Sequence, residues 1–380
     1  MAGVYVHIPF CASRCLYCDF FSTTALERRK EYVDALLKEM ELRKGDKTDY
    51  GTGEVETIYI GGGTPSQLRA EELGRIFDAV YANFRVSENA EVTIECNPED
   101  VDKCFLDGLR KLPVNRVSMG IQSFDDERLR FLCRRHNSEK AINAVHILQD
   151  EGYENISIDL MFGFPGERIT DWEQDLRTAV QLGIPHLSAY SLMYEEGTRL
   201  TKLRDAGKIM PIADEESLAM YTLLLTYTEK CGYEHYEISN FSKAGYTSRH
   251  NNCYWTGVPY IGFGAGAHSY DGKQLRRWNV SSLDSYMKGV NNGESYFENE
   301  MLSERDIYNE YIMTRLRTRI GIDLGEFECI YGEDEANALF KEMMERHISL
   351  GNLTTCDGHL RLTRKGLFIS DSVMSDFFVV

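Results

Sequence analysis

The sequence lacks the features of several large classes of protein. No apolar run approaches the ~18 residues that a membrane-spanning helix needs, no amino-terminal signal peptide is recognisable, and only 8 of the 380 residues are proline. Basic residues are few, because 42 Lys and Arg stand against 60 Asp and Glu, which gives a net charge of −18. A nucleic-acid binder needs Lys and Arg to neutralise phosphates. We therefore expect a cytoplasmic protein that neither spans a membrane nor binds nucleic acid.

The 10 cysteines lack the pattern of a disulfide framework. Seven of them are scattered without pairing, as expected of small buried side chains in a reducing compartment. The other three, Cys11, Cys15 and Cys18, fall within eight residues of each other in HIPFCASRCLYCDF. No second CxxC or HxxxH pair completes the four ligands of a zinc site. Three thiolates are also one short of the usual set for a 4Fe-4S cluster, so they predict a cluster with one iron open to another ligand.

Short apolar strands alternate with amphipathic helices through the first half of the chain. The alternation is typical of a parallel sheet or barrel. Strands are expected at residues 4–8, 56–60, 91–96, 116–121, 155–162 and 186–193. Six units are too few for a closed eight-stranded barrel, so we predict an α/β fold with a partial (β/α)6 TIM-type barrel. Chemistry in such barrels lies at the carboxyl ends of the strands.

The alternation stops near residue 200, which divides the chain into three predicted parts. Residues 1–200 form the barrel, residues 201–302 connect it to the rest, and residues 303–380 form a smaller, mainly helical domain with a winged-helix-like end. The glycine-rich IGFGAGAHSY in the middle part follows no βαβ pattern. We therefore interpret it as close backbone packing and not as a dinucleotide site.

Polar and glycine residues stand where the predicted strands end. The second strand runs into Gly61, Gly62, Gly63 and Thr64, where backbone amides come close to a ligand. Glu95, Gln122 and Asp159 end the next three strands, and a carboxylate or amide there binds a hydroxyl, an amine or an adenine edge. Any one of them could instead cap a helix, but three successive strands that end in this way favour a shared ligand. Arg134, which we place in the helix after the fourth strand, either pairs with a ligand carboxylate or is a solvated charge.

Five motifs, HIPFCASRCLYCDF, GGGTP, VSMGIQSF, DLMFGFPG and HNNCYW, together resemble one branch of the radical S-adenosylmethionine (radical SAM) superfamily. The branch contains the oxygen-independent coproporphyrinogen III dehydrogenases and the HemW family of heme chaperones. The resemblance implies that Cys11, Cys15 and Cys18 hold a 4Fe-4S cluster whose open iron chelates S-adenosylmethionine. The residues that it places around the cofactor are Tyr5, Tyr17, Gly62, Gly63, Thr64, Glu95, Gln122, Arg134 and Asp159. Whether one or two S-adenosylmethionine molecules bind stays open.

Two departures separate the chain from the dehydrogenase pattern. Phe20 stands where the dehydrogenases carry a fourth cysteine, and the chain reaches Cys11 without the long preceding arm. Both departures favour the chaperone. HNNCYW also fits the HNxxYW motif that the resemblance associates with heme, and we place it in a loop. It implies heme binding by His250, Asn251, Tyr254 and Trp255, since imidazole is a common axial ligand and aromatic rings stack on a macrocycle; the thiol of Cys253 is the alternative ligand.

The resemblance leaves two functions to compare. The first is a heme chaperone that uses its cluster and S-adenosylmethionine for dimerisation or release and delivers heme to respiratory hemoproteins at the membrane. The second is an oxygen-independent coproporphyrinogen III oxidase of porphyrin biosynthesis, which converts two propionates to vinyl groups through a 5′-deoxyadenosyl radical. RNA modification by a radical enzyme is a distant third, because the chain is acidic. Phe20 and HNNCYW favour the chaperone.

Overall fold

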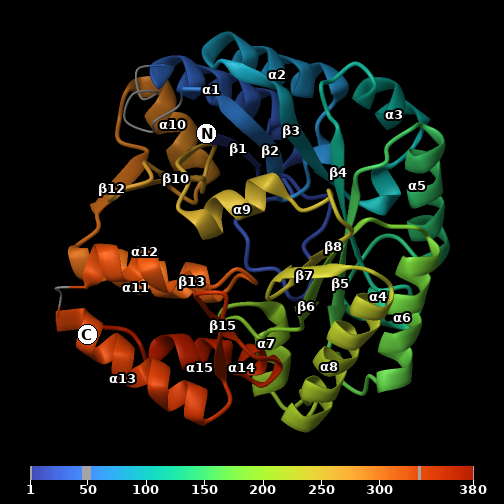
Figure 1. Cartoon of the computed structure of the whole chain (residues 1–380). Helices are drawn as coiled ribbons and strands as arrows, with labels where there is room; N and C mark the ends of the chain where they lie inside the picture. Colours follow the sequence, from blue (N-terminus) through green and yellow to red (C-terminus); the bar gives the residue numbers. More distant parts are fainter. Residues whose placement is uncertain (1, 45–52, 333–334, 380) are drawn as a thin grey trace.

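A computed structural model describes residues 2–44, 53–332 and 335–379 and confirms the predicted partial barrel (Figure 1). Six neighbouring strands run parallel and curve into an open barrel. They are β1 (Ala2–Ile8), β2 (Val55–Gly62), β3 (Val86–Cys96), β4 (Arg116–Gln122), β5 (Ile156–Phe162) and β6 (His186–Ser191). Every one overlaps a strand expected from the sequence.

Alternation along each strand gives the barrel two different faces. Side chains such as Val4, Ile58, Val117 and Ile158 are buried in the apolar core. They pack with residues of the outer helices, which include α1 (Arg29–Leu42), α2 (Ala70–Asn83), α3 (Lys103–Leu109), α5 (Ser138–Asp150), α6 (Ile169–Gln181) and α8 (Asp214–Lys230). The alternate positions, among them Tyr5, Thr93, Glu95 and Asp159, are largely polar and point to the barrel interior. The interior is therefore built to hold polar ligands.

The segment 201–302 adds strands to both edges of this sheet. β8 (Asn240–Ser242) and β7 (Glu234–Glu237) continue it beyond β6, and β9 (Tyr260–Phe263) pairs with β1. β10 (His268–Tyr270), β11 (Leu275–Asn279) and β12 (Phe297–Met301) follow antiparallel, and α10 (Leu283–Asn292) packs beside α1. The glycine-rich run does pack closely, because a Cβ at Gly262 would lie 2.1 Å from the carbonyl oxygen of His268.

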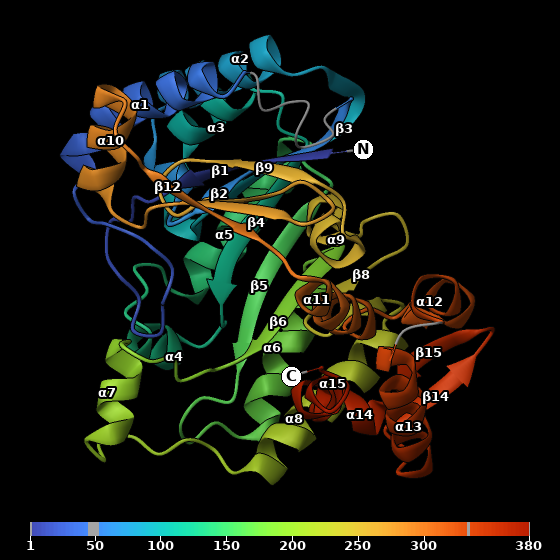
Figure 2. The ribbon, with the colours of Figure 1, turned by 90° about the vertical axis from the view of Figure 1, so that its left-hand side faces the viewer.

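The HNNCYW segment is a helix, and its prediction as a loop is wrong. It forms α9 (Arg249–Thr256), which begins at the cap residue Ser248 and ends at Gly257, whose φ is +68°. In Figure 2 this helix lies at the opposite end of the barrel strands from the loop that follows β1 and carries Cys11, Cys15 and Cys18. The motif expected to bind heme and the motif expected to bind a cluster are thus separated by the length of the strands.

The carboxyl-terminal part has its own apolar core, which includes Tyr308, Phe327, Phe340 and Phe377. Its small antiparallel sheet has the order β13-β15-β14. The elements are α11 (Glu304–Leu316), β13 (Ile322–Asp323), α12 (Leu324–Tyr331), α13 (Glu335–Ser349), β14 (Leu353–Cys356), β15 (His359–Leu362), α14 (Arg364–Phe368) and α15 (Ser370–Ser375). A tight turn at Asp357 and Gly358 joins β14 to β15, as expected; the winged-helix assignment stays a prediction. Across the described parts of the chain, no helix is long and apolar enough to cross a bilayer.

Candidate functional site

A pocket at the carboxyl ends of β1 to β5 gathers every residue predicted to hold the cluster or S-adenosylmethionine. Its lining includes the three motif cysteines, and Phe20, which is 63% exposed, also lies on its wall. The predicted cofactor residues in the lining are Tyr5, Tyr17, Gly62, Gly63, Thr64, Glu95, Gln122, Arg134 and Asp159. Residues from five strands and the loops after them thus converge, as expected for a barrel of this kind. Their individual roles stay predictions.

The cysteine loop is held by backbone bonds at both ends. The amide of Cys11 donates to the carbonyl of Thr23 (2.9 Å), and the amide of Leu16 donates to the carbonyl of Leu132 (3.1 Å). Leu16 is buried in a small apolar cluster with Leu132 and Phe164. These contacts tie the cysteine loop to the loop that carries Leu132.

Polar groups surround the cysteine sulfurs. The hydroxyl of Thr64 donates to Cys11 Sγ (3.5 Å), and the guanidinium of Arg134 donates to Cys15 Sγ (3.4 Å). Burial raises the pKa of the Cys18 thiol to about 11. Among the described residues, no three Cys, His, Asp or Glu side chains lie close enough to share a single metal ion. Thiolates around a 4Fe-4S cluster bind different irons, so three separated thiols next to a cation fit a cluster.

The glycine run shapes the pocket wall beside Glu95. Gly62 has φ +115°, and a Cβ there would lie 2.6 Å from the ring of His7, so only glycine fits. Its amide donates to Glu95 Oε2 (3.0 Å), while the hydroxyl of Tyr59 donates to Glu95 Oε1 (2.7 Å). Burial raises the pKa of Glu95 to about 7, although both hydrogen bonds act in the opposite direction. Both carboxylate oxygens are therefore oriented by hydrogen bonds.

Arg134 lies in the pocket but not in the predicted element. The helix after β4 is α4 (Asp126–Phe131), and Arg134 stands in the loop beyond it. Its guanidinium donates to the side chain of Asn97 (2.6 Å) and to the carbonyl of Gly120. The reading as a solvated helix-face charge is thus wrong. Asn97 also donates to Thr64 (3.2 Å), so it links two predicted residues, and sequence reasoning missed it although it stands two residues after Glu95.

Gln122 and Asp159 reach the pocket in different ways. Gln122 has φ +72°, which is uncommon for a residue with a side chain, and it follows an irregularity in the pairing of β4 with β5. This backbone turn lets its amide line the pocket. Asp159 points inward from β5, and burial raises its pKa to about 6, while Ser188, Arg116 and Arg134 oppose that shift.

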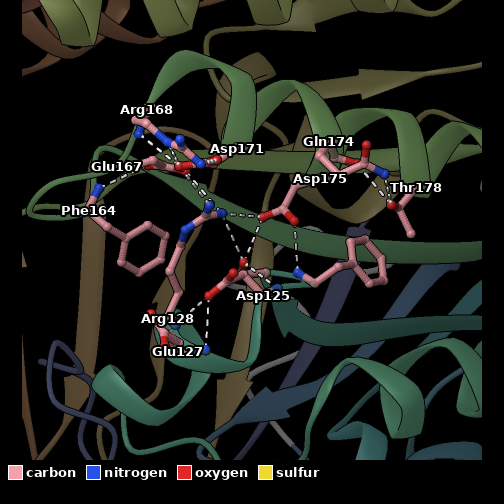
Figure 3. Close-up of polar contacts among 12 residues, drawn as sticks. Asp125, Glu127, Arg128, Phe164, Glu167, Arg168, Asp171, Gln174, Asp175 and Thr178 are labelled. Atoms are coloured by element: carbon pink, nitrogen blue, oxygen red, sulfur yellow. Dashed lines mark hydrogen bonds and ion pairs between the residues drawn. The ribbon is translucent and has the colours of Figure 1, made fainter.

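A network of buried charge holds the loop that follows β5 (Figure 3). Arg128 Nη1 lies 3.2 Å from Glu167 Oε1 and 3.1 Å from Asp175 Oδ2. Glu167 Oε2 accepts the amide hydrogens of Gly163 and Phe164 (3.0 Å for the latter). Phe164 packs in the apolar cluster that contains Leu16 of the cysteine loop. The charge network therefore stabilises the cysteine loop indirectly, through Phe164.

The predicted heme residues lie at the other end of the barrel. His250 is 1% exposed, and its two ring nitrogens are hydrogen-bonded, Nδ1 to Thr57 Oγ1 (2.8 Å) and Nε2 to the hydroxyl of Tyr254 (3.0 Å). Cys253, the alternative ligand, is also buried, and its thiol donates to the carbonyl of Arg249 (3.4 Å). Asn251 and Trp255 are partly exposed. Neither candidate ligand is accessible to iron while α9 stays in this position.

Comparison with known proteins places the chain among proteins of similar length. Residues 5–179 match the radical SAM superfamily, and residues 302–369 match the HemN C-terminal domain. The chain is 33% identical to the heme chaperone HemW of Bacillus subtilis, with 99% of both chains aligned. It is 33% identical to the heme chaperone HemW of Escherichia coli, over 99% of this chain and 97% of that protein.

One solved structure resembles the whole fold. Coproporphyrinogen III oxidase (HemN) from Escherichia coli, described as a radical SAM enzyme, superposes with a TM-score of 0.84 over 99% of this chain and 89% of that one. The two sequences are 22% identical. The likeness shows the shared barrel and carboxyl-terminal domain, and it does not distinguish between the two functions.

Proposed function

Because the chain belongs to the HemW family of the radical SAM superfamily, we propose that it is a cytoplasmic heme chaperone that passes heme to respiratory hemoproteins at the membrane. The observation that carries this proposal is the similarity to HemW proteins along nearly the whole of both chains. Phe20 supports it, because a phenyl ring cannot replace the thiol at the fourth cysteine position.

The pocket at the strand ends is the proposed site of the cluster and S-adenosylmethionine. Cys11, Cys15 and Cys18 would bind three irons, and the fourth iron would take the amine and carboxylate of the cofactor. When bound, the cluster supplies an electron and an open coordination position. The protein supplies oriented groups: Glu95 presents a fixed carboxylate to a hydroxyl or amine, and Arg134 places positive charge beside Cys15.

We propose that heme binds at α9, with His250 as axial ligand and Asn251, Tyr254 and Trp255 against the macrocycle. Ligation by His250 requires that one of its ring nitrogens lose its hydrogen bond, to Thr57 or to Tyr254. Because the ring is buried, α9 has to move before iron can reach it. Dimerisation belongs to the same proposal, as the event through which the cluster and S-adenosylmethionine promote release of heme.

The second candidate is the coproporphyrinogen III oxidase reaction, which the complete set of three cluster cysteines favours. One anaerobic experiment separates the two functions. Reconstituted protein receives coproporphyrinogen III, S-adenosylmethionine and a strong reductant, while parallel samples are titrated with hemin. We expect tight hemin binding and no protoporphyrinogen at catalytic turnover; the reverse result would refute the chaperone.

A further inference from the structure

The ring of His250 lies against a tyrosine that is hydrogen-bonded to a residue of the cofactor pocket. The imidazole and the ring of Tyr59 are stacked, with centroids 5.1 Å apart and an interplanar angle of 26°. The hydroxyl of Tyr59 donates to Glu95 Oε1 at 2.7 Å, and Glu95 lines the pocket. Three side chains thus connect α9 at one end of the barrel with the cofactor pocket at the other.

Four hydrogen bonds hold the imidazole and the backbone beside it. Besides the bonds from its ring nitrogens to Thr57 and Tyr254, its backbone amide donates to Glu91 Oε1 (3.0 Å), and the amide of Arg249 donates to Glu91 Oε2 (3.0 Å). Glu91 is buried on β3, so its carboxylate anchors the first turn of α9 to the barrel. A helix anchored in this way holds the His250 ring still.

His250 does not act on its neighbours through charge. Burial, together with the nearby charge of Arg116, lowers the pKa of His250 to about 3, so the ring is neutral at physiological pH. A neutral ring contributes through packing and through hydrogen bonds of fixed direction. The Tyr59 ring packs against the imidazole, and its hydroxyl orients the Glu95 carboxylate. An aromatic side chain has only two rotatable bonds, so restraining the Tyr59 ring also restrains its hydroxyl.

We propose that His250 is a positioning residue for the S-adenosylmethionine pocket and acts on Glu95 through Tyr59. This inference rests on the proposed role of the pocket in binding S-adenosylmethionine, and it is independent of heme. Removal of the imidazole leaves a void beside Tyr59, so that ring, and the carboxylate it orients, sample more positions. The HNNCYW helix then has a second role, which is to hold the floor of the cofactor pocket.

The chain offers a matched control in His186. It is also fully buried, and its ring nitrogens bond to two hydroxyls, Nδ1 to Ser157 (2.7 Å) and Nε2 to Tyr236 (2.8 Å). Burial also lowers the pKa of His186. Its hydroxyl partners are not among the pocket-lining residues. His186→Ala therefore makes a similar void in the same barrel and leaves the Tyr59–Glu95 pair intact.

The test measures the dissociation constant of S-adenosylmethionine by equilibrium dialysis on anaerobically reconstituted protein. Iron content and the thermal midpoint are recorded for every variant. We expect His250→Ala to raise the constant about tenfold, and His186→Ala to change it less than twofold at a similar thermal midpoint. The electron paramagnetic resonance spectrum of the reduced cluster, which changes when S-adenosylmethionine binds, provides a second readout at a fixed cofactor concentration.

Two milder variants keep the test decisive if His250→Ala does not fold. Tyr59→Phe keeps the ring and removes its bond to Glu95. Gly3→Ala would put a Cβ 3.0 Å from Thr57 Oγ1 and 3.1 Å from His250 Cε1, so the hydrogen-bonded Thr57–His250 pair has to shift by a few tenths of an ångström, while Gly3 itself lies outside the pocket lining. We expect a weaker affinity from both, and no additional loss when the two substitutions are combined. Equal losses in His250→Ala and His186→Ala, or no loss in Tyr59→Phe, would overturn the inference; failure of the wild type to bind S-adenosylmethionine would instead contradict the proposed function.

Discussion

At the scale of single residues, we expect Glu95 to make the affinity for S-adenosylmethionine depend on pH. Burial raises its folded-state pKa to about 7, and the carboxylate is the form that accepts hydrogen bonds from a ribose hydroxyl. Affinity should therefore fall as pH falls through 7. If only the ionised form binds, the dissociation constant of S-adenosylmethionine rises about tenfold from pH 8 to pH 6. Equilibrium dialysis across this range provides the measurement.

Glu95→Gln is the control for titration of the cofactor itself. Its amide cannot ionise, so any pH dependence that remains in this variant belongs to S-adenosylmethionine or to other pocket groups such as Asp159. We expect a weaker affinity and a flatter profile than in the wild type. Equal slopes in the two proteins would contradict the assignment of the pH dependence to Glu95.

Most of the predicted pocket residues were identifiable because they lie in a short motif or at the end of a strand, whereas Tyr5 and Arg134 came from the family resemblance. Glu95, Gln122 and Asp159 follow apolar runs, and parallel strands bring their carboxyl ends together. Asn97, Thr57 and Glu91 were missed because their partners are far away in the sequence. The Glu91 carboxylate, for example, accepts a hydrogen bond from the amide of His250, which lies 159 residues later in the sequence. Such a contact forms only in the tertiary structure, and no local sequence pattern indicates it.

At the scale of secondary-structure elements, the loop after β5 depends on Arg128. This side chain is 12% exposed and lies among Glu167, Asp175 and Asp171 (Figure 3). Arg128→Ala leaves two buried carboxyl groups without their cation. Loss of one partner of a buried pair costs about 3 kcal/mol or more, so we expect the free energy of unfolding in urea to fall by about that amount at pH 8.

The same variant should lose less stability at pH 6. Burial raises the folded-state pKa values of Glu167 to about 7 and of Asp175 to about 6, above their ordinary values. The folded protein then binds more protons than the unfolded chain, so stability falls as pH rises through this range. Without Arg128 these pKa values rise further, and the slope becomes steeper. Arg130→Ala, on the same helix but 71% exposed, is the control; a loss independent of pH would contradict the expected protonation.

The helix α9 shows where the local sequence was insufficient. Asn, Cys, Tyr and Trp are all weaker helix formers than Ala or Leu, so HNNCYW favours no helix by composition. The structure forms one because Ser248 caps its start, the Glu91 carboxylate accepts its first amides, and Gly257 ends it. Ser248 and Gly257 were visible in the sequence, but the Glu91 contact was not.

At the scale of the whole molecule, the carboxyl-terminal domain holds α9 in place. The guanidinium of Arg317 lies over the ring of Trp255, 4.6 Å from its centroid, and its Nε donates to Glu237 Oε2 (2.8 Å). Glu237 is buried on β7. One arginine thus joins the carboxyl-terminal domain, the sheet edge and the HNNCYW helix. The sequence indicated each of these parts separately, but docking between them depends on surfaces that form only after folding.

Arg317→Ala should release α9 and make the HNNCYW motif more accessible. Removal of the guanidinium uncovers Trp255 and removes the cation from Glu237, which keeps its bonds from Asn240 and the amide of Ser239. Trp172 is fully buried, so a gain in tryptophan quenching by acrylamide would report on the exposed rings. If heme binding requires α9 to move, hemin should also associate severalfold faster with this variant.

Arg319→Ala is the matched control, because Arg319 pairs with Glu234 and both side chains are exposed. Such surface pairs contribute little to stability, so equal quenching and equal hemin rates in the two variants would show that Arg317 does not restrain the helix.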